Sequence, residues 1–381
     1  MEKTIIGLDL DRENAQISFY NTRSMELETV STGQNCYLIP TPEDLFPLIE
    51  ESVELGLMAL ANFLKSCISL IKPAVRMDMA CMMVTMKEMR LPWPDAIRDA
   101  CEMLGMCRED VFLQTHAESF CSYTLNQKKD IWMRRVALFE YEGTKIYPSV
   151  LSVDYGTKPA LVTVEQKKEV QMGTKGIGTE QEWNEKRDRL FLQAIEDTFG
   201  AENFSAAYLI GDSFDKSWAV ESLQFLCRRR HVFQGRNLYT KGACYAAMQR
   251  MGVGKNLDAY LYYSEDMVET NLSMRMEIRG KASSYLLVNA GVNWFEAGHI
   301  CEFIPDGTNE IVIYGRSMRG GDAESYSIVL KGLPQRPGRT TRLWLQASFL
   351  SAKRCKITIR DLGFGEFYPP SGMVWESILE V

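Results

Sequence analysis

The spacing of apolar and polar residues changes near residue 255, and this change divides the chain into two parts. Before it, apolar runs typical of buried strands alternate with segments whose apolar residues recur at helical spacing. After it, helical periodicity almost disappears, and short alternating runs follow one another. The pattern predicts an α/β domain at residues 1–254 and an all-β domain at residues 255–381. The boundary is expected between Gly252 and Asn271.

The first part opens with a predicted hairpin. Residues 4–10 form a buried-strand pattern, residues 15–20 supply an antiparallel partner, and the polar residues 11–14 between them form the turn. The further predicted strands are 79–86, 111–113, 135–141, 146–154 and 206–210. The predicted helices are 43–71, 93–104, 117–126, 180–199, 215–228 and 240–250. Strands and helices that alternate in this way are typical of a sheet covered by helices.

The second part has the pattern of a β-sandwich. Its alternating runs are separated by turns rich in Gly and Pro, such as residues 306–307 and 334–338. The clearest runs are 272–278, 310–314, 326–330, 342–346 and 355–359.

Composition limits the classes of function. The net charge of −7 argues against a general nucleic-acid binder, which needs a basic face. The run Arg228-Arg-Arg-His231 is a local exception; we interpret it as a solvated helix end, with contact to an anion as the alternative. The longest apolar stretch, residues 55–71, contains Asn62 and Lys65, so it predicts a core helix and no membrane partner.

The cysteines and histidines indicate neither disulfides nor a metal site. The ten cysteines form no CxxC pair, and the first residues show no secretory signal. Free thiols in a reducing compartment fit best, so we expect a cytoplasmic protein. The three histidines, at positions 116, 231 and 299, lack the spacing of metal ligands.

Three stretches, residues 111–123, 209–214 and 241–247, stand in the order expected of a nucleotide-binding domain of the actin and heat-shock chaperone superfamily. With them, residues 1–250 resemble the ATPase domain of the seventy-kilodalton heat-shock chaperones. The resemblance implies an actin-like, ribonuclease-H-like domain of two lobes, at about residues 1–134 and 135–254.

Within the second part, residues 272–370 resemble the peptide-binding β-domain of the same chaperones. The resemblance rests mainly on Gly332-Leu-Pro-Gln-Arg-Pro-Gly338 and on Arg360-Asp-Leu-Gly363. It implies binding of a protein or an extended peptide, and we expect no helical lid after this domain. Candidate groove residues, for which packing in the core is the simpler interpretation, are Tyr285, Leu287, Trp294 and Phe303.

The first phosphate-binding hairpin of the family is altered here. The resemblance places Asp9 where the family has its magnesium-side carboxylate, and it retains Asn14. The turn glycine is replaced by Asp11, and Arg12 and Glu13 replace two threonines. A carboxylate at the glycine position blocks the approach of phosphate to the backbone and repels it. Arg12 could offset this in part as an anion ligand.

The second phosphate hairpin is also degenerate. Its best match is Glu140-Tyr-Glu-Gly143-Thr144, in which only Gly143 and Thr144 keep the family residue. The family's hydrolytic glutamate lies on the segment that contains His116 and Glu118. Either side chain could act as a general base, although helix capping or a buried polar role is the simpler interpretation.

The adenosine-contacting turn corresponds to Gly211-Asp212-Ser213, and the small-residue helix that closes beside it contains Gly242. Asp212 replaces a glycine of the family. It could reach a ribose hydroxyl or cap the following helix.

These observations favour a chaperone-like binding or scaffold protein with a degenerate, non-hydrolysing nucleotide site. ATP or ADP with magnesium remains a possible cofactor. The first alternative is an ATP-dependent chaperone-type ATPase that uses Asp9, Glu140 and a base at His116 or Glu118. A second alternative is an actin-like protein that forms polymers or organises the cell.

Overall fold

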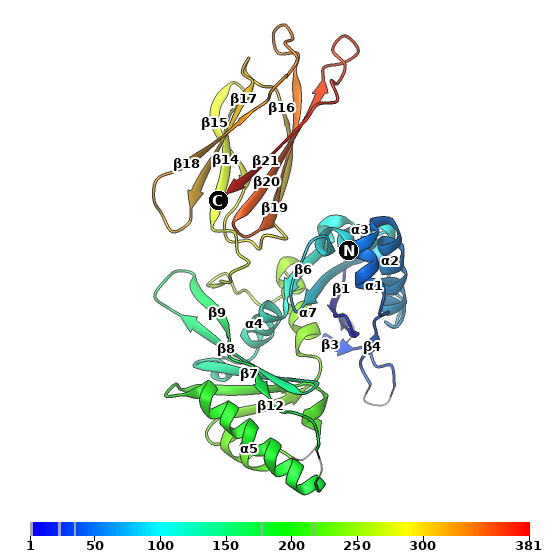
Figure 1. Ribbon diagram of the computed structural model, residues 1–381, viewed down its shortest axis with the longest axis vertical. Helices are drawn as coiled ribbons and strands as arrows, with labels where there is room; N and C mark the ends of the chain where they lie inside the picture. Colours follow the sequence, from blue (N-terminus) through cyan, green and yellow to red (C-terminus); the bar gives the residue numbers. More distant parts are fainter. Residues whose placement is uncertain (1–2, 22–23, 34–35, 177, 216–217) are drawn as a thin grey trace. The chain divides into compact units, whose positions relative to one another are not determined.

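The computed structural model describes residues 3–21, 24–33, 36–176, 178–215 and 218–381 (Figure 1). The chain forms two compact units, Met1–Tyr262 and Tyr263–Val381. No helix in the described ranges has the length and apolar character needed to cross a bilayer.

Lobe I, the first half of the first unit, is a mixed sheet in the order β3-β2-β1-β5-β6, with β4 paired to β2. Its strands are β1 (Thr4–Leu10), β2 (Asn14–Asn21), β3 (Glu26–Thr29), β4 (Ile39–Pro40), β5 (Ala80–Met86) and β6 (Val111–Thr115). Strands β1 and β2 are antiparallel, whereas β1, β5 and β6 run parallel. The apolar run of β5 is buried at every position, as expected for a strand covered on both faces.

The helices of lobe I correct one prediction. They are α1 (Leu45–Glu51), α2 (Val53–Ser69), α3 (Trp93–Met103) and α4 (His116–Asn126). The single helix predicted at 43–71 is broken because Ser52 has an extended backbone. The chain then turns back, and Gly56 lies so close to Ile49 that a side chain at Gly56 would overlap the Ile49 backbone. Helical periodicity continues across the break, so the pattern could not reveal it.

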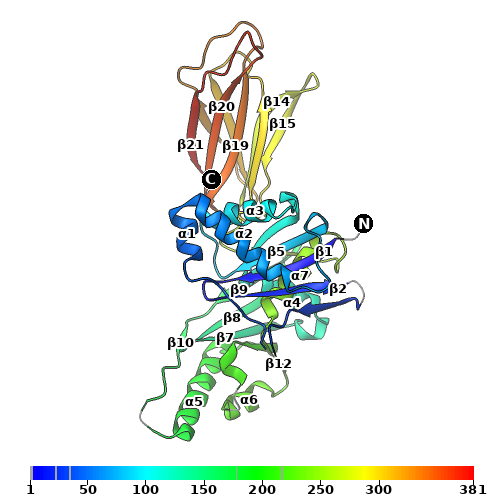
Figure 2. The same cartoon turned by 90° about the vertical axis from the view of Figure 1, so that its right-hand side faces the viewer.

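Lobe II is a second mixed sheet, in the order β12-β11-β7-β8-β9-β13, with β10 paired to β8 (Figure 2). Its strands are β7 (Arg135–Glu142), β8 (Lys145–Asp154), β9 (Ala160–Gln166), β10 (Val170–Gln171), β11 (Phe204–Ile210), β12 (His231–Gly235) and β13 (Tyr260–Tyr262). Strands β7, β8 and β9 form an antiparallel meander, and β7, β11 and β12 are parallel. The two mixed sheets fit the actin-like ATPase-type fold.

Helices cover both faces of the lobe II sheet. They are α5 (Glu180–Phe199), α6 (Val220–Leu226) and α7 (Leu238–Arg250). One face packs on α5 and α6 through a core that includes Phe139 and Phe191, and the other packs on α4 and α7 through Phe120 and Leu238. Helix α6 is shorter than the predicted helix 215–228, part of which lies outside the described residues. The described part of the unit also contains the short 3₁₀ helices η1 (Met77–Met79), η2 (Arg108–Asp110), η3 (Lys129–Ile131) and η4 (Asp212–Asp215).

Helix α7 joins the two lobes of the first unit. It follows β12 of lobe II in sequence, yet Ala243 and Ala247 pack on Ile5 and Cys81 of the lobe I sheet. Helix α7 can approach β1 closely because residue 7 is a glycine. A side chain at Gly7 would overlap the Thr240 carbonyl oxygen of α7.

The second unit consists of two four-stranded antiparallel sheets, in the orders β15-β14-β17-β18 and β16-β19-β20-β21. The strands are β14 (Thr270–Ile278), β15 (Lys281–Val288), β16 (Gly298–Phe303), β17 (Glu310–Ser317), β18 (Glu324–Val329), β19 (Arg342–Ser351), β20 (Arg354–Gly363) and β21 (Val374–Glu380). Alternate residues of β19 are buried, including Leu343, Leu345 and Ala347. The sequence pattern did not predict β15, β16 or β21, whose residues are largely exposed and so lack a clear apolar alternation.

Candidate functional site

Four elements of the first unit meet where β1 and β7 approach their carboxyl ends. In mixed α/β sheets this is the edge at which ligands bind. Asp9 lies near the end of β1, Glu140 lies near the end of β7, His116 begins α4, and Tyr239 lies in the first turn of α7. We call these four residues the central cluster.

The central cluster is a chain of direct contacts. His116 Nε2 lies 2.7 Å from Asp9 Oδ1. The His116 ring stacks on Tyr239, with 3.8 Å between the ring centroids and 15° between the planes. The Tyr239 hydroxyl donates a hydrogen bond of 3.0 Å to Glu140 Oε2. One carboxylate of each lobe is thus held by a residue of α4 or α7.

Burial and charge act in opposite directions on His116. Burial lowers the pKa of His116. The charge and the hydrogen bond of the Asp9 carboxylate raise it, and the net shift is upward. The pKa of Glu140 is raised, mainly by burial. The protonated, imidazolium form of His116 is therefore favoured beside Asp9. The buried Nδ1 atom of His116 has no hydrogen-bond partner within the described ranges.

The titration of His116 tests this pairing. We expect an NMR midpoint above the ordinary value of 6.5, with the resonance assigned by its loss in His116→Gln. In Asp9→Asn the midpoint is expected to fall, because burial then acts without the charge and the hydrogen bond of Asp9. By linkage, the stability that the pair contributes is full below pH 6.5 and is lost as the pH rises through the raised pKa. A midpoint unchanged by Asp9→Asn would contradict the pairing.

A cavity of about 380 Å³ opens beside the central cluster. Its polar lining residues are Lys87, Glu88, His116, Glu140, Tyr147, Ser149, Gln166 and Tyr239. Lys87 follows the end of β5; its Nζ lies 2.6 Å from Glu142 Oε2 and 4.4 Å from the centroid of the Tyr147 ring. The cavity therefore combines a lysine with the partly buried carboxyl group of Glu140 and the exposed one of Glu88.

The Asp11 carboxylate forms a hydrogen bond with the backbone of its own turn, the first hairpin turn. The Arg12 amide donates a hydrogen bond of 2.6 Å to Asp11 Oδ1, and the Asp11 amide donates to the Asn14 carbonyl at 3.1 Å. Asn14 itself pairs with Pro40 of β4. Two backbone donors of this turn, the amides of Asp11 and Arg12, are thus engaged within the turn and are not free for a phosphate.

The Arg12 side chain lies against lobe I helices. Its guanidinium is 5.8 Å from the centroid of Phe46 and 5.5 Å from that of Trp93, and it pairs with Glu50 at 3.7 Å. Aromatic stacking and an ion pair hold it there.

The second hairpin is too short to enclose a phosphate. Only Gly143 and Thr144 separate β7 from β8, and Gly143 adopts a φ of 56°, which suits a two-residue turn. The Thr144 hydroxyl accepts a hydrogen bond of 3.0 Å from Gln171 Nε2, and its carbonyl accepts the Met172 amide at 2.8 Å. Thr144 thus ties the turn to β10.

The glycines predicted at the adenosine site have packing roles. Gly211, with a φ of 103°, lies where a side chain would overlap the Tyr141 carbonyl oxygen. Gly242 lies where a side chain would overlap the Ser119 carbonyl oxygen of α4. After Gly211, the Ser213 carbonyl accepts the Trp218 indole N–H at 2.8 Å. The side chain of Asp212 lies outside the described residues.

Aromatic side chains fill the space beyond this turn. Phe214 and Trp218 are buried and stack with their ring planes 16° apart. Both rings contact Tyr141 and Phe191, which closes the cluster against β7 and α5. Packed aromatic side chains therefore occupy the space at the carboxyl end of β11.

Glu118, the other candidate base, caps a helix. Its carboxylate accepts the Thr115 amide at 2.8 Å, and the Thr115 hydroxyl accepts the Glu118 amide at 3.4 Å. This reciprocal capping box satisfies two backbone donors at the start of α4.

The residues present do not fit magnesium-ATP in the pose that the fold family implies. That pose needs free backbone donors in both hairpins. Here the Arg12 amide is occupied by Asp11, the second turn has two residues, and Asp9 is held by His116. Within the described ranges, no group of three or more His, Cys, Asp or Glu side chains could hold a metal ion.

Sequence reasoning missed Tyr239, Lys87 and Tyr147. Lys87 could have been found, because it follows a buried strand that is parallel to β1. Tyr239 gave no signal, since its position depends on how α7 packs between the lobes.

Two family models match the chain. One, described as the C-terminal part of a family of unknown function (DUF5716), matches residues 49–265. The other, a domain of unknown function (DUF8552), matches residues 267–381. No curated protein matches the chain.

Solved structures of sugar kinases and related proteins align with the chain at low similarity. An inorganic polyphosphate/ATP-glucomannokinase from Arthrobacter sp. strain KM has 13% identity and a TM-score of 0.41, over 65% of this chain and 98% of that one. A ROK family protein from Streptococcus pneumoniae TIGR4 in complex with sucrose has 11% identity and a TM-score of 0.38, over 65% and 99%.

A ROK family glucokinase from Streptomyces griseus in complex with glucose and AMPPNP has 10% identity and a TM-score of 0.40, over 65% and 100%. None of these three is a heat-shock chaperone. With TM-scores below 0.5, they do not bear on the activity of this chain.

Proposed function

The chain belongs to the DUF5716 C-terminal family of unknown function, and from its own geometry we propose that it is a non-hydrolysing binding or scaffold protein. In this proposal an actin-like ATPase-type fold presents surfaces to a protein or extended peptide. The phosphate site of the fold is closed by the chain's own side chains.

The hydrogen bond from the Arg12 amide to the Asp11 carboxylate carries this proposal. A backbone amide that already donates to a carboxylate is not free to bind a phosphate oxygen. The carboxylate also repels a polyphosphate, and this repulsion is strong at short range where water is partly excluded. The Asp9–His116 pair adds to the effect because it engages the carboxylate that the family would use for magnesium.

Isothermal titration with magnesium-ATP tests the proposal. We expect a Kd weaker than about 1 mM and no turnover for the natural chain. In the triple variant Asp11→Gly, Arg12→Thr, Glu13→Thr, the carboxylates are removed and the turn donors are freed, so binding should tighten at least about tenfold.

Asp322→Gly is a matched control, because it removes an exposed carboxylate in the second unit and should change nothing. Micromolar binding with turnover by the natural chain would refute the proposal.

The alternative function is an ATP-dependent hydrolase, and the central cluster with its cavity of about 380 Å³ is the observation that favours it. Asp9 next to His116 is a pair that can hold and transfer a proton. This alternative requires measurable ATP hydrolysis that Asp9→Asn abolishes.

Peptide binding by the second unit would not use the groove residues suggested by the sequence. Leu287 and Trp294 are buried in the core, and Trp294 donates to Asp266 Oδ1 at 3.0 Å. Tyr285 is engaged with His299 Nε2 at 2.9 Å, and Phe303 is partly buried at the end of β16. The open edges of its sheets are the surfaces left for an extended peptide.

A further inference from the structure

We propose that lobe II binds an acidic segment of a partner protein at the amino-terminal edge of its parallel strands, with an apolar side chain of that segment in a cavity beside Met133. This inference rests on the proposed binding function and gives its partner a chemistry. The surface lies at the end of β7 opposite to the phosphate hairpin, so it does not depend on the state of the nucleotide site.

The topology brings several arginines to this edge. Strands β7, β11 and β12 are parallel neighbours that begin at Arg135, Phe204 and His231. Their starts are therefore side by side, and those of β7 and β12 are about 10 Å apart across β11. A contact of 3.8 Å between Asp130 and His231 also joins the segment before β7 to the start of β12.

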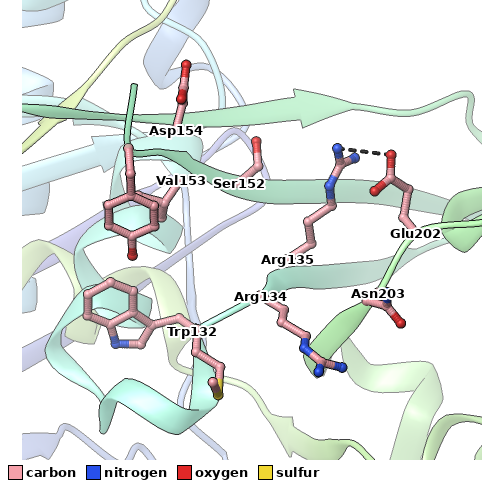
Figure 3. A pocket seen from close by; sticks show the side chains of 10 residues that line it. Trp132, Arg134, Arg135, Ser152, Val153, Asp154, Glu202 and Asn203 are labelled. Atoms are coloured by element: carbon pink, nitrogen blue, oxygen red, sulfur yellow. Dashed lines mark ion pairs between the residues drawn. The ribbon is translucent and has the colours of Figure 1, made fainter. Parts of the chain in front are cut away.

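A cavity of about 390 Å³ lies at this edge (Figure 3). It is lined by residues 132–135, by residues 152–155 at the end of β8, and by residues 202–203 before β11. Met133 and Tyr155 are 61% and 57% exposed, so they present apolar surface to solvent. A cavity of this volume accepts a large apolar side chain.

The arginines around the cavity differ in how they are paired. Arg135 points toward Glu202, at 3.0 Å, whereas Arg134 points away from that pair (Figure 3). Within the described ranges, Arg134, Arg228 and Arg229 make no ion pair. Arg230 is committed elsewhere, because it donates to the Phe225 carbonyl.

Three guanidinium groups without an ion pair in the described ranges thus gather at one edge, although the chain as a whole has a net charge of −7. They attract an anionic partner, and arginine binds carboxylates through paired hydrogen bonds. The solvated helix end expected from the sequence thus becomes part of a surface suited to anions.

An acidic polypeptide fits this surface better than a nucleic acid does. Glu202, Asp130 and Asp154 lie among the arginines and would repel a continuous phosphate backbone. Carboxylates spaced along a peptide can meet the arginines and avoid these residues.

Fluorescence anisotropy with the full chain tests the proposal. The probes are labelled peptides of about twelve residues, rich in Glu, with either Leu or Gly at the centre. We expect the Leu peptide to bind at least about fivefold more tightly than the Gly peptide, and a version with Lys in place of Glu not to bind. Arg134→Glu and Arg228→Glu should each weaken binding at least about tenfold. Met133→Gln should remove the preference for Leu.

Arg316→Glu is the matched control, because it makes the same charge change on an exposed residue of the second unit. Unchanged affinity in Arg134→Glu and Arg228→Glu, or equal affinity for the Glu and Lys peptides, would overturn the proposal. Tighter binding of a labelled oligothymidine than of the Leu peptide would also overturn it. None of these results depends on ATP, so a failure of this proposal is distinguishable from a failure of the proposed function.

Discussion

Replacing Asp361 by alanine is expected to lower the free energy of unfolding of the second unit by about 3–5 kcal/mol. The Asp361 side chain is fully buried, and Arg336 beside it is 7% exposed. Arg336 donates two hydrogen bonds, of 2.8 and 2.7 Å, to the two Asp361 oxygens. The alanine variant would leave the Arg336 guanidinium buried without its charge partner.

The same carboxylate anchors a turn. Asp361 accepts the Gly363 amide at 3.0 Å and the Ser371 amide at 2.9 Å. The hydrogen bonds from Arg336 hold the pKa of Asp361 well below its usual range. A lowered pKa means that this stability is present above pH ~4 and is lost as the pH falls toward the folded-state pKa. The free energy of unfolding of the alanine variant should therefore decrease less than that of the natural chain as the pH is lowered.

Urea unfolding of the full chain, followed at several pH values, measures both effects. Asp322→Ala, at an exposed carboxylate of the same unit, is the control and should change stability by less than about 0.5 kcal/mol. A loss below about 1 kcal/mol for Asp361→Ala would show that the pair contributes no more than an exposed one.

Gly242→Ala is expected to destabilise the first unit by at least about 3 kcal/mol. In an ordinary helix interior this change stabilises by about 1 kcal/mol, because alanine loses less backbone entropy than glycine. Here a methyl group would overlap the Ser119 carbonyl oxygen, so α7 and α4 would have to separate. The sign of the effect is therefore reversed.

Thermal unfolding of the full chain distinguishes these two outcomes. Gly235→Ala, in β12, is the control, since an added methyl group there would meet no atom within 4 Å. Its effect should be much smaller. Stabilisation by Gly242→Ala would mean that the two helices are not held in close contact at this glycine.

The sequence predicted those elements whose local signals agree with their burial. Helix α5 was predicted at its observed bounds, because its capping box at Thr179 and Glu182 marks its start and Gly200 follows its end. Strand β12 was missed because its residues are largely exposed and show no apolar alternation. Its position at the sheet edge follows from pairing with β11, which no local pattern encodes.

The candidate site, too, could be predicted from the sequence only in part. The positions of Asp9, His116 and Glu140 could be expected from the order of the strands, and the structure brings all three into one cluster with Tyr239. Gly242 and Gly211 looked like ligand contacts in sequence, but each is a point where two backbones meet. A glycine that admits a phosphate and one that admits a carbonyl oxygen are indistinguishable in a single sequence.

The position of α7 has a consequence for biosynthesis. Strand β1 leaves the ribosome long before α7, yet Ile5 packs on Ala243 and Ala247 of α7, and Gly7 lies against Thr240 of the same helix. During translation one face of the amino-terminal sheet stays exposed to water until residue 250 has emerged. A nascent chain stalled before α7 would therefore expose this face to chaperones and proteases.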